Sequence, residues 1–423
     1  MALKGCLTVA SDKSITHRAI IFSSLAKGTT NIYHPLLGAD CLSTLAIFEN
    51  FGIHSQIKDD CLTITSPGLD AFEVQSSILD AKNSGTTARL LMGVFSYLNE
   101  PVTLIGDESL SKRPMGRVMT PLTQMGARIE LQDGATLPAQ ISPSQLSGID
   151  YELPVASAQV KSAMMLAGML AKGRTTIYEP VPTRDHTEKM FEDFSIQYQK
   201  VDRIITIEGP QLPQTPKEVF VPGDISSAAF FIVAALIVPG SHVTIKNVGV
   251  NETRSGIIDV IRSMGGKITL LNERYFGGEP VADLDVAYTK DLVATTVEGE
   301  MIPRLIDEIP ILALLATRAS GTTIIKDAEE LKVKETNRID VTVEQLKAIG
   351  ADIQATEDGM MITGHPEGVF YEANVSSHKD HRIAMMLCVA SLLLEKPLLI
   401  EDIESMDVSY PDFLKHLQAL LEN

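Results

Sequence analysis

Residues 11–19 read SDKSITHRA, and the interpretation of the whole chain starts from this stretch. It follows a strand-like run, residues 7–9, and precedes an apolar run, residues 19–25, that has the composition of a buried helix. A polar turn that opens a helix presents N–H groups without internal partners at the positive end of the helix dipole. Lys13 and Arg18 add two cations to this turn. The stretch therefore predicts a site for a phosphate or a carboxylate.

The same stretch has a simpler interpretation, in which Ser14 or Thr16 only caps the helix and the basic side chains face solvent. The charge of the chain bears on this choice. The 423 residues have a formal net charge of −18, and 44% of them are hydrophobic. This balance argues against broad binding to nucleic acid or to a membrane surface. An acidic protein that binds an anion needs local clusters of Lys and Arg, so such clusters are informative here.

The remaining bulk features point to a cytoplasmic protein of two or three domains without a metal or cofactor. The four cysteines form no CxxC pair, and the nine histidines do not cluster as metal ligands. The first residues do not resemble a signal or transit peptide. The longest apolar runs, residues 228–238 and 383–394, are too short to cross a bilayer and are expected to be buried helices. No P-loop, GxGxxG, HExxH or GxSxG pattern is present.

One pattern recurs six times along the chain. A polar turn opens an apolar helix, a β-branched strand follows, and an amphipathic second helix often leads to further strand. The opening helices are expected to begin near His17, Thr86, Gln159, Ser226, Ile309 and Arg382. A period of roughly 70 residues is longer than that of the usual solenoid repeats, so each repeat is large enough to be a small α/β subdomain.

Six repeats predict an α/β fold of two pseudo-symmetric halves with three repeats each. The division lies near residues 222–224, where the fourth opening helix begins. The N-terminal strand, residues 3–9, has no partner in its own repeat, and the last repeat lacks a terminal strand. We therefore expect the N-terminal strand to complete the C-terminal half. The predicted domains are residues 13–223, and residues 1–12 together with 224–423.

The opening helices are apolar nearly all round, which predicts that they are buried and that only their N-termini are exposed. We expect these positive ends to converge on a cleft between the two domains. The polar motifs lie there or in nearby loops: NSGTTARLL (83–91), SKRPMGR (111–117), VASAQVKSA (155–163), TRDHTEKM (183–190), LIDEIP (305–310), KVKETNR (332–338) and HKDHRIAMM (378–386). Taken singly, each could be a helix cap, a solvated turn or a surface ion pair. Lys334, Glu335 and Arg338 would share one face if their segment were helical.

Together with DKSITHRA, these motifs resemble, in order and over the whole chain, those of the bacterial EPSP synthase (3-phosphoshikimate 1-carboxyvinyltransferase) family. The resemblance implies two domains, each of three βαβαββ repeats, with the active site in the cleft between them. It implies transfer of the enolpyruvyl group of phosphoenolpyruvate to the 5-hydroxyl of shikimate 3-phosphate, with release of phosphate. This reaction belongs to the shikimate pathway of aromatic amino-acid synthesis. The expected enzyme is monomeric and uses no cofactor.

The resemblance also implies the residues of the site. Those expected to bind shikimate 3-phosphate are Lys13, Ser14, Arg18, Ser157, Ala158, Gln159, Arg184, Asp307 and Lys334. Those expected to bind phosphoenolpyruvate are Lys13, Asn83, Gly85, Arg113, Gln159, Arg338 and Arg382. Asp307, Glu335 and Lys13 are the expected catalytic residues. In this hypothesis Asp307 takes the proton of the 5-hydroxyl, and Glu335, assisted by Lys13, protonates carbon.

Three positions differ among members of the family or bear on inhibition. Ala158 occupies a position where some members have a second Ser, so a backbone group is expected to supply one phosphate contact. Val408 stands where some members have a phosphate-binding Lys. Gly85 stands where Ala gives some members tolerance to the inhibitor glyphosate, so we expect a glyphosate-sensitive enzyme. The differences at Ala158 and Val408 are expected to affect the degree of this sensitivity.

Two alternatives remain open at this stage. The sister enzyme that transfers enolpyruvate to UDP-N-acetylglucosamine shares the fold and the donor. Its usual catalytic Cys lies in the loop that reads LSKRPMGR here, which has no Cys. A non-catalytic relative would require loss of Lys13, Asp307 or Glu335, and all three are present.

Overall fold

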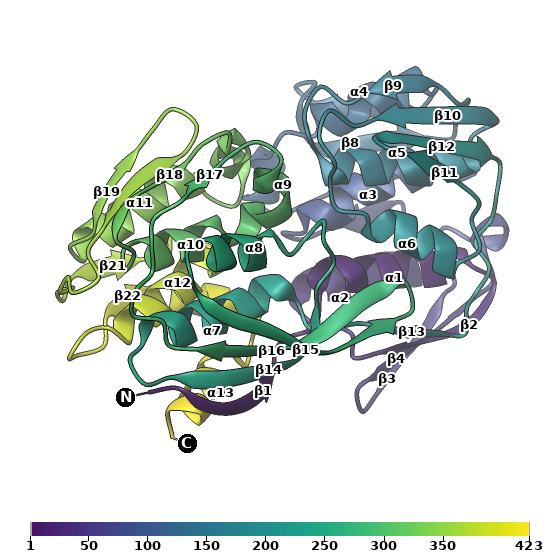
Figure 1. Cartoon of the computed structure of the whole chain (residues 1–423). Coiled ribbons are helices and arrows are strands. Elements are labelled where there is room, and N and C mark those ends of the chain that lie inside the picture. The colour runs from purple at the N-terminus through teal and green to yellow at the C-terminus, as the bar shows by residue number, and fades with distance from the viewer. Residues whose placement is uncertain (1, 423) are drawn as a thin grey trace. The chain divides into compact units, whose positions relative to one another are not determined.

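The computed structural model describes residues 2–422, which form two compact α/β units (Figure 1). We call them the N-terminal unit and the C-terminal unit after the larger part of each. The N-terminal unit consists of Ser11–Val221 and Phe276–Glu279. The C-terminal unit consists of Met1–Ala10, Pro222–Tyr275 and Pro280–Asn423. The division into domains made from the sequence remains a prediction about independent folding.

The N-terminal unit contains three repeats. The first is built from β13 (Glu218–Phe220), α1 (Lys13–Leu25), β2 (Gly28–Tyr33), α2 (Ala39–Glu49), β3 (His54–Lys58) and β4 (Cys61–Ser66). The second is built from β5 (Ile78–Asp80), α3 (Gly85–Phe95), β6 (Val102–Ile105), α4 (Gly116–Gln124), β7 (Arg128–Gln132) and β8 (Thr136–Ser142). The third is built from β9 (Asp150–Glu152), α5 (Ala158–Leu170), β10 (Gly173–Tyr178), α6 (His186–Asp193), β11 (Gln199–Val201) and β12 (Ile204–Gly209).

The C-terminal unit repeats the plan. Its first repeat is built from β1 (Lys4–Thr8), α7 (Ile225–Ile237), β14 (His242–Gly249), α8 (Gly256–Ser263), β15 (Lys267–Phe276) and β16 (Glu279–Ala287). The second is built from β17 (Thr296–Val297), α9 (Met301–Leu305), α10 (Ile309–Ala316), β18 (Gly321–Ile325), α11 (Arg338–Ala348), β19 (Asp352–Ala355) and β20 (Met360–Gly364). The third is built from β21 (Asn374–Ser376), α12 (His381–Ser391), β22 (Leu399–Glu401) and α13 (Phe413–Leu421).

Five of the repeats contain the same four-stranded sheet. The orders are β13-β2-β4-β3, β5-β6-β8-β7, β9-β10-β12-β11, β1-β14-β16-β15 and β17-β18-β20-β19. In each sheet the first two strands named are parallel. In the sheets that begin with β5, β9 and β17, a helical segment connects these two strands, as parallel pairing requires. The sixth repeat has only the parallel pair β21–β22. The predicted repeat pattern is therefore confirmed, with the last repeat cut short.

Two sheets take their first strand from a distant part of the chain. β1 pairs in parallel with β14, so that Lys4 lies opposite His242. β13 pairs in parallel with β2, so that Glu218 lies opposite Asn31. The role of β13 was not anticipated from the sequence, because three residues between Pro-rich turns give almost no strand signal.

The opening helices form the interior of each unit. All residues of α7 and α10 are buried, as their apolar composition predicts. In the C-terminal unit α7, α10 and α12 contact one another, and the strands of the unit lie outside them (Figure 1). In the N-terminal unit α3 contacts both α1 and α5. Because the sides of these helices are buried, polar residues that contact a ligand can lie only at the helix ends.

Five of the second helices, α2, α4, α6, α8 and α11, are followed by a residue in the left-handed conformation. Gly52, Gly126, Gly265 and Gly350 all have positive φ. Ser195, at the one position without Gly, also adopts a positive φ of 61°. A single polar residue can accept this conformation at a modest cost, so the repeat keeps its turn there.

Candidate active site

The N-terminus of α1 places Lys13 next to a carboxylate. Asp12 caps the helix through a 2.8 Å hydrogen bond from Ile15 N to its Oδ1. The cap is thus Asp12 and not Ser14 or Thr16, because the helix begins earlier than the sequence suggested, at Lys13 itself. Lys13 Nζ lies 2.9 Å from Asp40 Oδ2 on the first turn of α2. This ion pair holds a cation at the positive end of a helix.

Arg18 is buried one turn further along α1. Its Nε donates to Thr187 Oγ1 at 2.8 Å, its Nη2 to Ser162 Oγ at 2.7 Å and its Nη1 to Ser14 O at 3.0 Å. The pKa of Arg18 is lowered to about 10, chiefly by burial and in part by the charge of Arg184. The two cations thus act on each other electrostatically, which favours binding of a doubly charged anion.

A second cationic group surrounds the start of α3. Arg113 Nη2 donates to Asn83 Oδ1 at 2.8 Å, and Asn83 Nδ2 donates to Asp107 Oδ2 at 2.7 Å. A Cβ atom built on Gly85 would lie 3.3 Å from Arg89 Nη1 and 3.5 Å from Arg113 Nη1. Two guanidinium groups thus approach Gly85, the first residue of α3, which has no side chain to block them.

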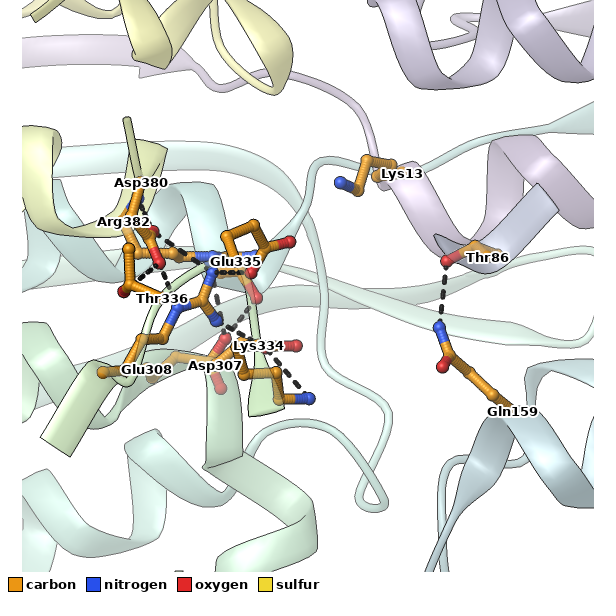
Figure 2. A network of polar contacts seen from close by, with 12 residues as sticks. Lys13, Thr86, Gln159, Asp307, Glu308, Lys334, Glu335, Thr336, Asp380 and Arg382 are labelled. Atoms are coloured by element: carbon orange, nitrogen blue, oxygen red, sulfur yellow. Dashed lines mark hydrogen bonds and ion pairs between the residues drawn. The ribbon is translucent and has the colours of Figure 1, made fainter. Parts of the chain in front are cut away.

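Gln159 links the starts of α3 and α5. Its Oε1 accepts a 2.7 Å hydrogen bond from Arg89 Nη1, and its Nε2 donates to Thr86 Oγ1 at 3.3 Å (Figure 2). Ser157 caps α5 by accepting from Val160 N, and Ala158 is the first helical residue. The hydroxyl of Ser157 keeps its proton for donation to a ligand.

In the C-terminal unit, three carboxylates share one buried guanidinium group. Arg338 Nε lies 2.8 Å from Asp380 Oδ2, Nη2 lies 2.6 Å from Glu335 Oε2, and Nη1 lies 3.2 Å from Asp307 Oδ1. Burial by itself would lower the pKa of Arg338, but the charges of Asp380, Glu335 and Asp307 outweigh it and raise the pKa. The side chain of Arg338 is 1% exposed, whereas those of Asp307 and Glu335 are 16% and 24% exposed. The two expected acid–base groups are therefore bound to a buried guanidinium group and remain partly exposed to solvent.

Residues 334–337 are not helical, so the condition under which Lys334, Glu335 and Arg338 would share a helix face is not met. Lys334 has extended backbone, and α11 begins only at Arg338, because Asn337 caps it through a hydrogen bond from Asp340 N. The contact between Glu335 and Arg338 therefore comes from the turn before the helix. Lys334 Nζ lies 3.9 Å from Asp307 Oδ1, so a cation faces this carboxylate (Figure 2).

Arg382 completes this group from the start of α12. Asp380 Oδ1 caps the helix by accepting from Arg382 N at 2.9 Å, while the same carboxylate binds Arg338. Arg382 Nη1 lies 4.0 Å from the buried Glu308 Oε1. Arg382 Nε is buried and has no hydrogen-bond partner within residues 2–422. This nitrogen is a donor that an anionic ligand could use.

The expected residues thus fall into two groups, one on each unit. The N-terminal unit carries Lys13, Ser14, Arg18, Asn83, Gly85, Arg113, Ser157, Ala158, Gln159 and Arg184. The C-terminal unit carries Asp307, Lys334, Glu335, Arg338 and Arg382. We call these the N-terminal cluster and the C-terminal cluster.

Sequence reasoning missed three residues that hold these clusters in place. Asp40 pairs with Lys13, Arg89 binds Gln159, and Asp380 binds Arg338. Arg89 and Asp380 lie inside motifs that were identified, and charged residues at the start of a buried helix are a usable signal. Asp40 gave none, since an acidic residue in a first helical turn is ordinary.

The clusters are suited to binding anions and moving protons. Among residues 2–422, no group of three or more His, Cys, Asp or Glu side chains could hold a metal ion. None of the helices in that range is both long and apolar enough to span a bilayer. What the clusters do contain is five Arg, two Lys and two accessible carboxylates, mostly at helix starts. Such a set can bind phosphate and carboxylate groups and can supply a general acid and a general base.

Comparison with known proteins agrees with this chemistry. The family model described as EPSP synthase (3-phosphoshikimate 1-carboxyvinyltransferase) matches residues 1–417. The chain belongs to the EPSP synthase family. A 3-phosphoshikimate 1-carboxyvinyltransferase of Bacillus velezensis is 50% identical over 420 residues, which are 99% of this chain and 97% of that protein. The Bacillus subtilis protein of the same name is 48% identical over 419 residues, again 99% and 97% of the two chains.

Solved structures give the same result for the EPSP synthase fold. An EPSP synthase structure from Acinetobacter baumannii matches with a TM-score of 0.87 and 41% identity, covering 99% of this chain and 96% of that one. The enolpyruvyl transferase NikO from Streptomyces tendae matches with a TM-score of 0.78 and 17% identity, covering 99% and 95%. At that identity the second match shows the fold alone.

Proposed function

We propose that this protein transfers the enolpyruvyl group of phosphoenolpyruvate to the 5-hydroxyl of shikimate 3-phosphate and releases phosphate. The reaction is that of a 3-phosphoshikimate 1-carboxyvinyltransferase in the shikimate pathway. The observation that carries the proposal is the attachment of Asp307 and Glu335 to the one guanidinium group of Arg338, in a chain that matches the family along its length.

Electrostatics supports this choice of substrates. Both substrates are multiply charged anions, and the reaction brings two phosphates and a carboxylate together. A chain with a net charge of −18 can offset their repulsion only through concentrated cations. Arg18 and Arg184 lie close together in one cluster, and Lys334 and Arg382 flank the carboxylates of the other. We propose that shikimate 3-phosphate contacts residues of both clusters.

The chemistry is an addition followed by an elimination. The 5-hydroxyl oxygen forms a bond to C2 of phosphoenolpyruvate while Asp307 takes the hydroxyl proton and C3 receives a proton from Glu335, assisted by Lys13. A tetrahedral phospho-ketal results. In the second step C3 returns a proton to Glu335, the bond from C2 to the phosphate oxygen breaks, and the leaving phosphate takes the proton from Asp307. Each group thus serves once as acid and once as base.

The remaining expected residues bind rather than react. Gly85, Asn83 and Arg113 are proposed to hold phosphoenolpyruvate in the N-terminal cluster. Arg382 is proposed to do so in the C-terminal cluster, where its buried Nε is available. Arg338 has all three of its nitrogens engaged by carboxylates. Its first task is therefore to position Asp307 and Glu335, and any contact with phosphoenolpyruvate is additional.

A phosphate-release assay with defined acceptors tests the proposed function. The expected result is phosphate release from phosphoenolpyruvate with shikimate 3-phosphate and none with UDP-N-acetylglucosamine. Release with the second acceptor only would favour the sister enzyme, and no release with either would favour a non-catalytic protein. We also propose that the protein is a cytoplasmic monomer, for which light scattering on the eluted protein should give a mass near 45.9 kDa.

A further inference from the structure

A buried group of charges lies beneath the N-terminal cluster. Lys161 is fully buried on α5, and its Nζ lies 2.8 Å from Glu188 Oε1 and 3.2 Å from Glu179 Oε1. Lys200 Nζ lies 3.2 Å from the same Glu188 oxygen. We call Lys161, Glu179, Glu188 and Lys200 the buried charge group, in which Lys200 lies at the solvent-exposed edge. Its two positive and two negative charges balance.

This group fixes the segment that carries Arg184. Lys161 Nζ donates to Thr183 O at 3.3 Å. Glu179 Oε1 accepts from Thr183 N at 3.0 Å and from Thr183 Oγ1 at 2.6 Å. Thr183 directly precedes Arg184, so three hydrogen bonds hold the backbone from which the Arg184 side chain extends.

The same group also supports Arg18. Ser162, next to Lys161 on α5, hydrogen-bonds Thr187, next to Glu188 on α6, at 2.7 Å. Both hydroxyl groups accept hydrogen bonds from the Arg18 guanidinium. The charge of Glu188 raises the pKa of Arg18, which opposes the effect of Arg184. Glu188 thus offsets part of the repulsion between two cations that lie close together without a ligand.

A contribution to folding stability does not by itself explain why these charged side chains are buried. The second oxygens of Glu179 and Glu188 are buried without a hydrogen-bond partner within residues 2–422. Burying charges is costly, and apolar residues of similar size often stabilise a protein as well or better. The costly arrangement does, however, define the geometry of the Thr183–Arg184 backbone more tightly than apolar packing would.

We propose that the buried charge group positions Arg184 and Arg18 to recognise the phosphate of the acceptor substrate. Lys161, Glu179 and Glu188 do not touch substrate and act through Thr183 and Thr187. The group therefore sets the preference of the enzyme for a phosphorylated acceptor over the same acceptor without phosphate. This inference rests on the proposed function.

The test compares kcat/KM for shikimate 3-phosphate with kcat/KM for shikimate. The ratio of these values does not depend on the fraction of enzyme that is folded. The double variant Lys161→Met/Glu188→Gln removes one positive and one negative charge, so the remaining charges balance. We expect the ratio to fall about ten- to a hundredfold, because a displaced guanidinium loses most of its oriented contact. The KM for phosphoenolpyruvate should change far less.

Two further variants keep the test decisive. Leu104→Ala creates a cavity in β6, in another repeat, and should lower stability without changing the ratio. Thr183→Val removes only the 2.6 Å hydrogen bond to Glu179 and should lower the ratio in the same direction if the double variant does not fold. An unchanged ratio in the double variant overturns the inference. If the double variant does not fold, an unchanged ratio in Thr183→Val overturns it instead. If the unsubstituted protein turns over neither acceptor, the proposed function fails, and this inference fails with it.

Discussion

Asp307 and Glu335 accept hydrogen bonds from the same guanidinium group. Arg338 Nη1 lies 3.2 Å from Asp307 Oδ1, and Arg338 Nη2 lies 2.6 Å from Glu335 Oε2. Because the guanidinium is planar and rigid, the position of one carboxylate fixes that of the other. The two carboxylates to which we assign opposite proton transfers are thus held at a set spacing by a residue that need not react.

Replacing Asp307 by Asn should abolish the removal of the hydroxyl proton while keeping the shape of the side chain. We expect kcat to fall about 100- to 10,000-fold, the usual range for a positioned general base. The dissociation constant of shikimate 3-phosphate, measured by calorimetry, should change little. Glu329→Gln, at an exposed position in the same unit, is the matched control. Near-normal turnover by Asp307→Asn with intact binding would rule out the proposed role.

Replacing Glu335 by Gln should affect the transfer of a proton to carbon. In heavy water, the unsubstituted enzyme should introduce deuterium into the methylene group of its product, because Glu335 delivers a solvent-derived deuteron to C3 and elimination can then remove an original proton from the resulting methyl group. Glu335→Gln should show both slow turnover and a loss of this label in single-turnover reactions followed by mass spectrometry. Full labelling at a normal single-turnover rate would assign the carbon proton to another group, with Lys13 the next to test.

Replacing Arg338 by Met should destabilise the C-terminal unit. The fully buried Asp380 would lose its charged partner, and removing one member of a buried ion pair costs about 3–5 kcal/mol. Urea unfolding monitored by circular dichroism measures this difference. Lys396→Met breaks an exposed pair with Glu372 and should cost only about 0–1 kcal/mol. Equal effects of the two variants would contradict the assigned role of Arg338.

His17 predicts a loss of stability in mild acid. Its pKa is lowered from 6.5 to about 3, chiefly by burial, with the charges of Lys13 and Arg18 acting in the same direction and the charge of Asp40 opposing them. Between these values the unfolded chain binds a proton that the folded chain does not. Stability should therefore decrease as pH falls from 6.5 towards 3, by at most about 1.4 kcal/mol per pH unit from this group.

The variant His17→Asn tests this contribution. Its side-chain oxygen can replace Nδ1 in the 2.8 Å contact with Thr44, and Nε2 of His17 has no partner to lose within residues 2–422. The free energy of unfolding in urea, measured from pH 7 to pH 4.5, should fall less steeply for this variant than for the unsubstituted protein. His54→Asn, on the exposed strand β3, is the control. Parallel pH profiles for His17→Asn and the unsubstituted protein would show that His17 titrates normally.

Gly85 predicts sensitivity to glyphosate. An added methyl group would lie 3.3 Å from Arg89 Nη1, so this guanidinium would have to move by a few tenths of an ångström. We expect millimolar glyphosate to inhibit the unsubstituted enzyme at low phosphoenolpyruvate. Gly85→Ala should raise the inhibition constant more than the KM for phosphoenolpyruvate, since the larger ligand meets the methyl group first. Absence of inhibition in the unsubstituted enzyme would refute the prediction.

Much of the fold follows from local patterns in the sequence. The six opening helices begin within a few residues of their expected positions, because an apolar stretch preceded by a polar turn specifies a buried helix and its start. The left-handed turns after the second helices also follow from single residues. Residues 334–338 do not form one helical segment because Asn337 caps α11, and a cap sets a helix start more firmly than side-chain spacing does.

The sequence by itself determined the repeat, the helix starts and the kinds of side chain that stand there, since these depend on residues close together in the chain. Only the tertiary structure decided that Arg338 binds Asp307, Glu335 and Asp380, and that β13 supplies the first strand of the first repeat. It likewise decided that Lys161 is hydrogen-bonded to Thr183 and Glu188, in the segment whose Thr187 contacts Arg18 of SDKSITHRA. Apart from the contact of Arg338 with Glu335, these pairings join residues far apart in the chain. They depend on how buried helices pack, and no local pattern of residue types specifies that packing.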